Sequence, residues 1–250
     1  MNGVLRYLQT IWQIFQKDVQ VEWRGRQGVP VMLVFALLVV FMFNFALQLS
    51  PELQAGLAAG LLWVSLAFAS TLGLNRSVSM ERENNALDGL LLAPVDRSAI
   101  FFGKALSNLA FTTLVALILL PVFSLFYQQN MLNLSLLLVI LLGVGAYTSL
   151  GTLLAALSIQ TRTRDVLLPV LLYPLALPIL IAAVEASRGV LSGQPINELQ
   201  SWFYLLLACN ILFMATGLMF FETILEDGNQ PENYTDLNGG KGQPIPSEPV

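Results

Sequence analysis

The sequence predicts an all-α polytopic membrane protein with six transmembrane helices, an interfacial amphipathic helix before them and a short cytoplasmic helix between spans two and three. Three observations support this fold class. Of the 250 residues, 56% are hydrophobic and only 11% are charged, whereas a soluble domain has roughly 25% charged residues. Six apolar stretches are each long enough to cross about 30 Å of hydrocarbon. The lysines and arginines gather in alternate connecting segments.

The N-terminal segment, residues 1–28, has an amphipathic pattern between residues 3 and 25. Leu5, Leu8, Trp12, Phe15 and Val19 share one helical face, and the polar side chains lie away from it. We interpret this helix as lying flat on the membrane, with tryptophans at headgroup level. The segment lacks the apolar core of a cleavable signal peptide. A soluble amphipathic helix packed on another domain is the alternative.

The membrane-spanning region, residues 29–225, holds the six apolar stretches. The first begins at Pro30, a favoured first helical position. The predicted spans are 30–49, 53–74, 105–127, 131–159, 166–184 and 201–224.

Small residues four apart allow helices to approach closely. Such pairs occur in the second and fourth spans: Gly56 with Gly60, Gly145 with Ser149, and Gly151 with Ala155. Several neutral polar residues also lie in the spans, and we expect them to hydrogen-bond between helices. They are Asn44, Asn108, Tyr147, Tyr173 and Asn210.

The fifth span contains Pro169, Pro174 and Pro178 within ten residues. Each proline removes a backbone donor and clashes with the preceding turn. We therefore expect a broken or re-entrant pair of helices, which together with Tyr173 would line a substrate path or act as a hinge. A kinked packing helix is the alternative.

The loop charges predict the orientation. Eleven of the twelve basic residues fall in segments on one side of the six spans, and only Arg188 falls on the other. The positive-inside rule then places both termini in the cytoplasm. We expect an external loop at 185–200 and a disordered cytoplasmic tail at 226–250, which is rich in Gly, Pro, Asn and acids.

The charged interval from Glu81 to Lys104 predicts the short cytoplasmic helix. Leu87, Leu90 and Leu91 form one apolar face. Pro94 ends the helix by excluding the preceding residue from the α region. Asp96 is then the predicted N-cap of the third span.

The residue inventory argues against an enzyme. There is no histidine and no G-x-x-x-x-G-K-[ST] motif, so neither a histidine-based catalytic or metal site nor a P-loop is expected. Cys209 lies in an apolar run and is expected to be inert. Because no ionisable residue lies at mid-span, coupling to protons or sodium is also disfavoured. A membrane transporter with neither a nucleotide site nor ion coupling needs an ATPase on a separate subunit. The Glu81–Leu92 helix would dock on this ATPase.

Three segments resemble the haem exporter protein B family, the permease subunit of the cytochrome c maturation system. The first is ERENNALDGLLLAPVDR with the following GKALSN. The second is the proline-rich LLPVLLYPLALPILIAA, and the third is the closing YLLLACNILFMATGLMFFETILED.

The resemblance implies a homodimer in the bacterial inner (plasma) membrane that couples ATP hydrolysis to haem export or to release of a haem-loaded chaperone. Implied partners are a CcmA-type ATPase, a CcmC-type haem-handling subunit, a CcmD-type small membrane subunit and a CcmE-type haem chaperone. Haem would be cargo and ATP would bind the partner, with no cofactor or metal on this chain. The implied coupling residues are Glu81, Leu87, Asp88, Gly89, Leu90, Leu91, Pro94 and Lys104.

Two other functions remain open at this point. One is an export permease for another amphipathic substrate, such as a lipid-linked sugar or a drug. The other is a membrane scaffold that assembles or strips a haem–chaperone complex and transports nothing.

Overall fold

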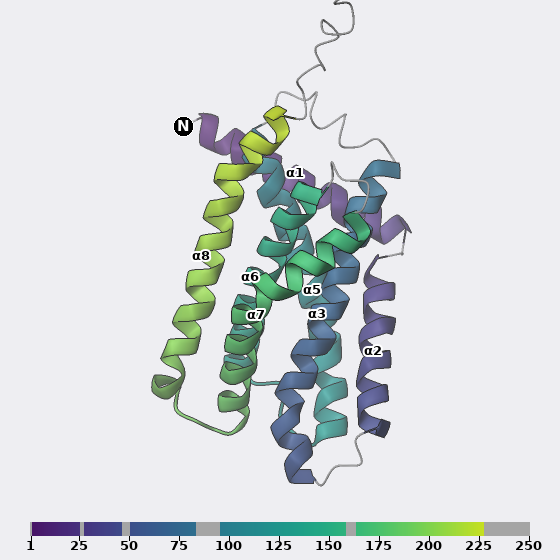
Figure 1. The fold of residues 1–250 in the computed structure, drawn as a ribbon, viewed down its shortest axis with the longest axis vertical. Helices are drawn as coiled ribbons and strands as arrows, with labels where there is room; N and C mark the ends of the chain where they lie inside the picture. Colours follow the sequence, from purple (N-terminus) through teal and green to yellow (C-terminus); the bar gives the residue numbers. More distant parts are fainter. Residues whose placement is uncertain (1, 26–27, 47–50, 84–95, 159–163, 228–250) are drawn as a thin grey trace, which may run out of the picture.

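The computed structural model describes residues 2–25, 28–46, 51–83, 96–158 and 164–227, and the regular structure in these ranges is entirely α-helical (Figure 1). The helices are α1 (Asn2–Gly25), α2 (Gly28–Ala46), α3 (Pro51–Glu83), α5 (Arg97–Tyr127), α6 (Leu134–Ser158), α7 (Arg164–Leu191) and α8 (Ile196–Asp227).

Six of these helices, α2 to α8, contain a stretch long and apolar enough to cross a membrane. Figure 1 shows them running side by side along the long axis of the molecule. The predicted all-α fold with six spans is confirmed, and the chain is a multi-pass membrane protein. The predicted tail at 226–250, apart from its first two residues, which end α8, and most of the predicted short helix lie outside the described residues.

The first helix, α1, lies across one end of the bundle in Figure 1. It packs against α5 through a face that includes Tyr7 and Ile14. Its more apolar face is a different one, and Leu5, Leu8 and Trp12 there are each more than half exposed. The bundle therefore leaves uncovered the face that the sequence assigns to lipid.

The packing centre is α6, whose span is 78% buried, compared with 17% for the span of α8. Its glycines make this possible. A side chain at Gly143 would overlap the Trp63 indole, and one at Gly151 would overlap Leu74. Gly145 and Gly151, the first members of the two predicted small-residue pairs of α6, thus both lie at helix contacts, because a Cβ at Gly145 would lie 2.7 Å from Asn210 Oδ1. Gly56 and Gly60 in α3 do not, because a Cβ there would meet nothing within 4 Å.

Polar side chains form hydrogen bonds between helices as predicted. The exception is Asn44, whose side chain forms no hydrogen bond with the described part of the chain. Two further interhelical bonds are a buried one of 2.9 Å from Trp63 Nε1 to Ser187 Oγ and one from Thr112 to Ser70. The predicted residues bond as follows: Asn108 Nδ2 to Thr152 Oγ1 at 3.0 Å, Tyr147 Oη with Thr71 Oγ1 at 3.0 Å, Asn210 Nδ2 to the Leu142 carbonyl at 2.7 Å, and Thr71 Oγ1 to Tyr173 Oη at 3.4 Å.

The prediction that α7 is a broken or re-entrant pair is wrong. The helix continues through Pro169, Pro174 and Pro178, although Figure 1 shows its direction changing along its length. Each proline removes one helical hydrogen bond, and the intervening residues keep theirs, so the helix bends without ending. The kinked-helix alternative describes α7.

The bounds of the predicted loop at 185–200 are also wrong, because α7 extends to Leu191 and α8 begins at Ile196. The intervening turn closes with two backbone bonds, from Gly193 N to the Val190 carbonyl and from Gln194 N to the Gly189 carbonyl. This is a Schellman motif, and Gly193 supplies the left-handed residue with φ of 72°.

Two other predicted boundaries need correction. The helix of span two does not end at residue 74 but runs to Glu83, so Glu81 and Glu83 end α3 rather than open a new helix. The helix of span three begins at Arg97, with Asp96 in the N-cap position but without a side-chain capping bond. Hydropathy marks where a helix leaves lipid, and these helices continue beyond that point.

Gly143→Leu should destabilise the bundle, because the new side chain has no space beside Trp63. Overpacking of this kind costs about 1–3 kcal/mol. Thermal unfolding of the detergent-purified chain would measure the change, with Gly56→Leu as the matched control, where the space is open. Equal unfolding midpoints for the two variants would contradict the assignment of α6 as the packing centre.

Candidate functional site

The predicted coupling residues fall mainly in the segment between α3 and α5. Leu87, Asp88, Gly89, Leu90, Leu91 and Pro94 lie outside the described residues. Glu81 lies near the end of α3, and Lys104 lies in the second turn of α5. The structure therefore describes the two helices that flank the segment, both of which reach the end of the bundle that carries α1 (Figure 1).

The start of α5 is held tightly against α1. Tyr7 donates a hydrogen bond of 3.2 Å from its hydroxyl to Ser98 Oγ. One turn further on, Gly103 allows close approach: a Cβ there would lie 2.7 Å from Ile14 Cγ2 and 3.3 Å from the Ile11 carbonyl oxygen. Only glycine permits this spacing without displacement of α1, so the two helices are in direct contact at this point.

Lys104 belongs to this junction. Its side chain is only 10% exposed, and its Nζ lies 4.0 Å from Asp18 Oδ2 on α1. Asp18 also pairs with its neighbour Lys17 at 3.2 Å. A buried lysine is stable only where charge and hydrogen-bond partners are supplied. Lys104 thus faces α1 and is turned away from solvent.

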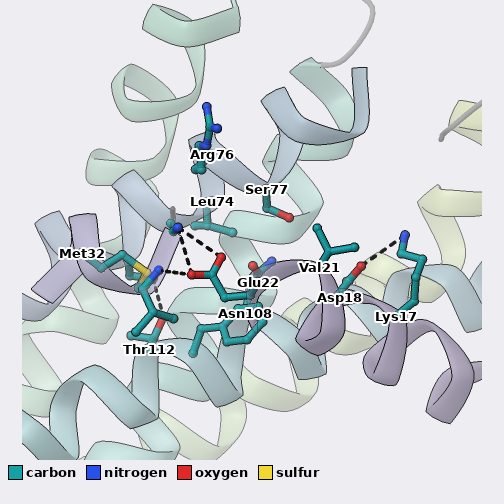
Figure 2. A pocket seen from close by; sticks show the side chains of 15 residues that line it. Lys17, Asp18, Val21, Glu22, Met32, Leu74, Arg76, Ser77, Asn108 and Thr112 are labelled. Atoms are coloured by element: carbon teal, nitrogen blue, oxygen red, sulfur yellow. Dashed lines mark hydrogen bonds and ion pairs between the residues drawn. The ribbon is translucent and has the colours of Figure 1, made fainter. Parts of the chain in front are cut away.

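A cavity of about 340 Å³ lies next to this junction, between α1, α2, α3 and α5 (Figure 2). Charged side chains line it from α1 and from α3. Hydroxyl and amide groups of α3 and α5 and apolar side chains of all four helices complete the wall. The lining residues are Lys17, Asp18, Val21, Glu22, Gly28, Val29, Met32, Ser70, Gly73, Leu74, Arg76, Ser77, Asn108, Phe111 and Thr112.

Glu22 fixes the connection from α1 to α2. Its carboxylate accepts hydrogen bonds from the Gly28 amide at 3.0 Å and from the Val29 amide at 2.7 Å. These amides belong to the first turn of α2. The N–H groups of a first turn have no acceptors within their own helix, and this end of a helix favours negative charge. Glu22 therefore caps α2 from the preceding helix and sets the angle between the two.

The predicted path or hinge residues of α7 point in two directions. Tyr173 turns inward, where its ring packs 5.5 Å from the Phe68 ring and its hydroxyl accepts from Thr71. Pro169 is half-buried, whereas Pro174 and Pro178 are exposed. The structure thus places Tyr173 in the bundle and two of the prolines on its outer surface.

The sequence alone does not identify Asp18 and Glu22 as site residues. The pattern of their helix distinguishes only an apolar face from a polar one. A signal was present for Glu22, since an acid shortly before a helix start matches the preference for negative charge at helix N-termini. Nothing in the sequence connects Asp18 with Lys104. Among the described residues, no group of three or more Cys, Asp or Glu could hold a metal ion.

Comparison with known proteins identifies the family. The family model described as CcmB protein matches residues 9–222, a range that includes α1 from residue 9 onward, all six spans and the cavity.

Curated relatives agree with this match. Heme exporter protein B of Rhodobacter capsulatus is 32% identical over 185 residues, which cover 74% of this chain and 85% of the relative. The protein of the same name from Pseudomonas aeruginosa is 30% identical over 68% of this chain and 77% of its own length. That from Escherichia coli K12 is 28% identical over 74% of this chain and 85% of its own length. The resemblance in the sequence is confirmed, and the chain belongs to the CcmB protein family.

Proposed function

We propose that this chain is the permease subunit of an ATP-driven complex that acts in haem export for cytochrome c maturation. The observation that carries the proposal is the family match over nearly the whole membrane region, together with relatives named Heme exporter protein B. The chain would lie in the bacterial inner membrane with both termini in the cytoplasm, as the distribution of basic residues favours.

The energy source would be a partner ATPase of the CcmA type. The sequence contains no P-loop motif. Ionisable residues in the described spans lie near the span ends, as with Lys104, Glu185 and Arg188. A permease with neither a nucleotide site nor a mid-membrane ion relay needs external work. CcmC-, CcmD- and CcmE-type proteins would complete the complex.

Coupling would pass through the segment between α3 and α5, and the α1–α5 junction supports a specific route. A force applied by the ATPase at Leu87, Leu90 and Leu91 would reach the first turns of α5. Because Gly103 and Lys104 pack against α1 there, α1 would move with α5. Lys104 would then act by joining these helices rather than by touching the ATPase.

A homodimer would use the outer face of α7. Val170, Pro174, Leu177, Pro178 and Ile181 form one exposed stripe. Without N–H groups at the two prolines, the carbonyls of Val170 and Pro174 lose their helical donors. Lipid offers no replacement donor, and such backbone is tolerated where protein or water covers it. A second copy packed on this stripe would cover it. Of the predicted path or hinge residues, Pro174 and Pro178 would then lie between the copies, and Pro169 and Tyr173 would act as a hinge within each bundle.

The cargo would be haem itself or a haem-loaded chaperone released on the outer side. Since this chain contains no histidine, any axial histidine ligand of haem would come from another subunit.

Leu90→Asp should separate the permease from its ATPase, because burying a leucine side chain at an interface is worth about 1.5–3 kcal/mol. We expect at least about tenfold less ATPase to co-purify, and c-type cytochromes to fall in the same cells. Asn197→Asp, exposed at the opposite end of the bundle, is the control. Normal ATPase recovery with Leu90→Asp would contradict the coupling segment, and normal cytochrome levels in a deletion strain would contradict the proposed function.

Cysteines at Gly89 and Ser192 should react with impermeant thiol reagents from opposite sides of the membrane. Ser192 is chosen over Gly193, because the positive φ of Gly193 disfavours other residues. The background carries Cys209→Ala, which removes the native thiol. Labelling of both positions from the same side would overturn the proposed orientation.

Leu177→Cys should cross-link two copies under mild oxidation in the Cys209→Ala background, because Leu177 lies on the exposed proline stripe of α7. Leu212→Cys on α8, which is exposed to a similar extent (58% against 55%), should cross-link far less. Equal dimer formation by both variants on a denaturing gel would argue against α7 as the interface.

A further inference from the structure

We propose that the Tyr173 hydroxyl is a releasable latch that holds the first part of α7 against α3, and that α7 bends at Pro174 and Pro178 when this latch opens. The first part, residues Arg164–Tyr173, is called the arm below. The inference rests on the proposed function, because it specifies how the hinge in α7 is held closed. The rest of α7 would stay in place as the base on which the arm turns.

The base is fixed to the bundle by close packing and a short hydrogen bond. Ala182, Ala183 and Ala186 are fully buried, and small side chains of this kind let helices in membranes approach closely. Trp63 Nε1 on α3 donates a buried hydrogen bond of 2.9 Å to Ser187 Oγ. Movement of the base would therefore break a good hydrogen bond and open close contacts.

The arm is held less firmly. Its sequence, RDVLLPVLLY, contains no glycine, alanine or serine, and Leu168 and Leu172 are its buried side chains. Its side-chain hydrogen bond to α3 joins Thr71 Oγ1 and Tyr173 Oη at 3.4 Å, which is long for a bond between two hydroxyls. The Tyr173 ring packs beside the ring of Phe68, which is itself 41% exposed. The two α3–α7 hydrogen bonds thus differ in length and in burial.

The bond to Tyr173 also competes with shorter ones. Thr71 has a single hydroxyl proton, and its Oγ1 lies 2.8 Å from the Ala67 carbonyl oxygen and 3.0 Å from Tyr147 Oη. Tyr147 Oη lies 3.2 Å from the same carbonyl. Thr71 and Tyr147 therefore keep hydrogen bonds when Tyr173 leaves, and the cost of release is limited to the Tyr173 hydroxyl.

The bending point lies between the latch and the base. Pro174 and Pro178 have no N–H group, so the helical bonds to the Val170 and Pro174 carbonyls are missing, and a helix bends most easily at such positions. In Figure 1 the first turns of α7 slant across the bundle and its last turns run along it. A swing of the arm would separate Tyr173 from Phe68 and open the bundle between α3 and α7.

The test is the alkylation rate of a buried cysteine in the purified full chain, in the Cys209→Ala background. Leu168→Cys reports on the arm and Ala183→Cys on the base, because these positions are only 2% and 0% exposed. We expect N-ethylmaleimide to react about fivefold faster with Leu168→Cys when Tyr173→Phe is added, since this change removes one hydrogen bond and keeps the ring. Thr71→Val, which removes the α3 partner, should also accelerate it. The rate at Ala183→Cys should not change with Tyr173→Phe.

Tyr204→Phe is the matched control, because it removes the hydroxyl of a tyrosine that is 65% exposed on α8, and it should change neither rate. An unchanged rate at Leu168→Cys with Tyr173→Phe would overturn the latch. So would equal acceleration at both cysteines, since the whole bundle would then have loosened. The assay needs neither haem nor an ATPase, so its failure would leave the proposed function standing, whereas normal cytochrome levels in a deletion strain would contradict that function alone.

Discussion

In the hydrocarbon layer a polar group without a partner costs several kcal/mol, and this constraint governs the whole bundle. Helices satisfy their own backbones. Buried hydroxyls bond back to the preceding turn, as Ser65 does with Leu61 and Thr148 with Val144. Groups that reach further join helices, as Asn210 does with the Leu142 carbonyl. Because lipid and apolar side chains are equally apolar, close packing at small residues such as Gly143 and these few bonds hold the helices together.

The same constraint explains which parts of the fold the sequence could predict. The number of spans follows from apolar length alone, and all six were found. The positions of the helix ends could not be predicted from hydropathy, because a helix can continue after it leaves the hydrocarbon. The segment from Asn75 to Glu83 has no proline or glycine to stop α3. At the other end of the bundle the stop signal was present in Gly193 followed by Pro195, the usual order for a helix C-terminus, but it lay within a segment interpreted as a loop.

The candidate site was predictable in part. Charge and leucine spacing marked the segment between α3 and α5, and prolines marked α7. Sequence cannot give the direction in which a side chain points once several helices meet. The sequence places Lys104 at the end of the charged interval that begins at Glu81, yet the fold turns its side chain towards Asp18. Pro174 and Pro178 were expected to break the helix, yet they lie on its outer surface, where the helix can bend without losing contact with the bundle.

Helix α1 contacts several parts of the structure, because its two faces and its C-terminal end each meet a different element. One face packs on α5 through Tyr7 and Ile14, and its apolar face is left for lipid. Its end is joined to α2 by Glu22. Because α1 is held at both places, the proposed coupling route would move α1, the start of α2 and the cavity between them together with α5. In that proposal the junction converts a movement at the membrane surface into a change in how the first and third spans are arranged.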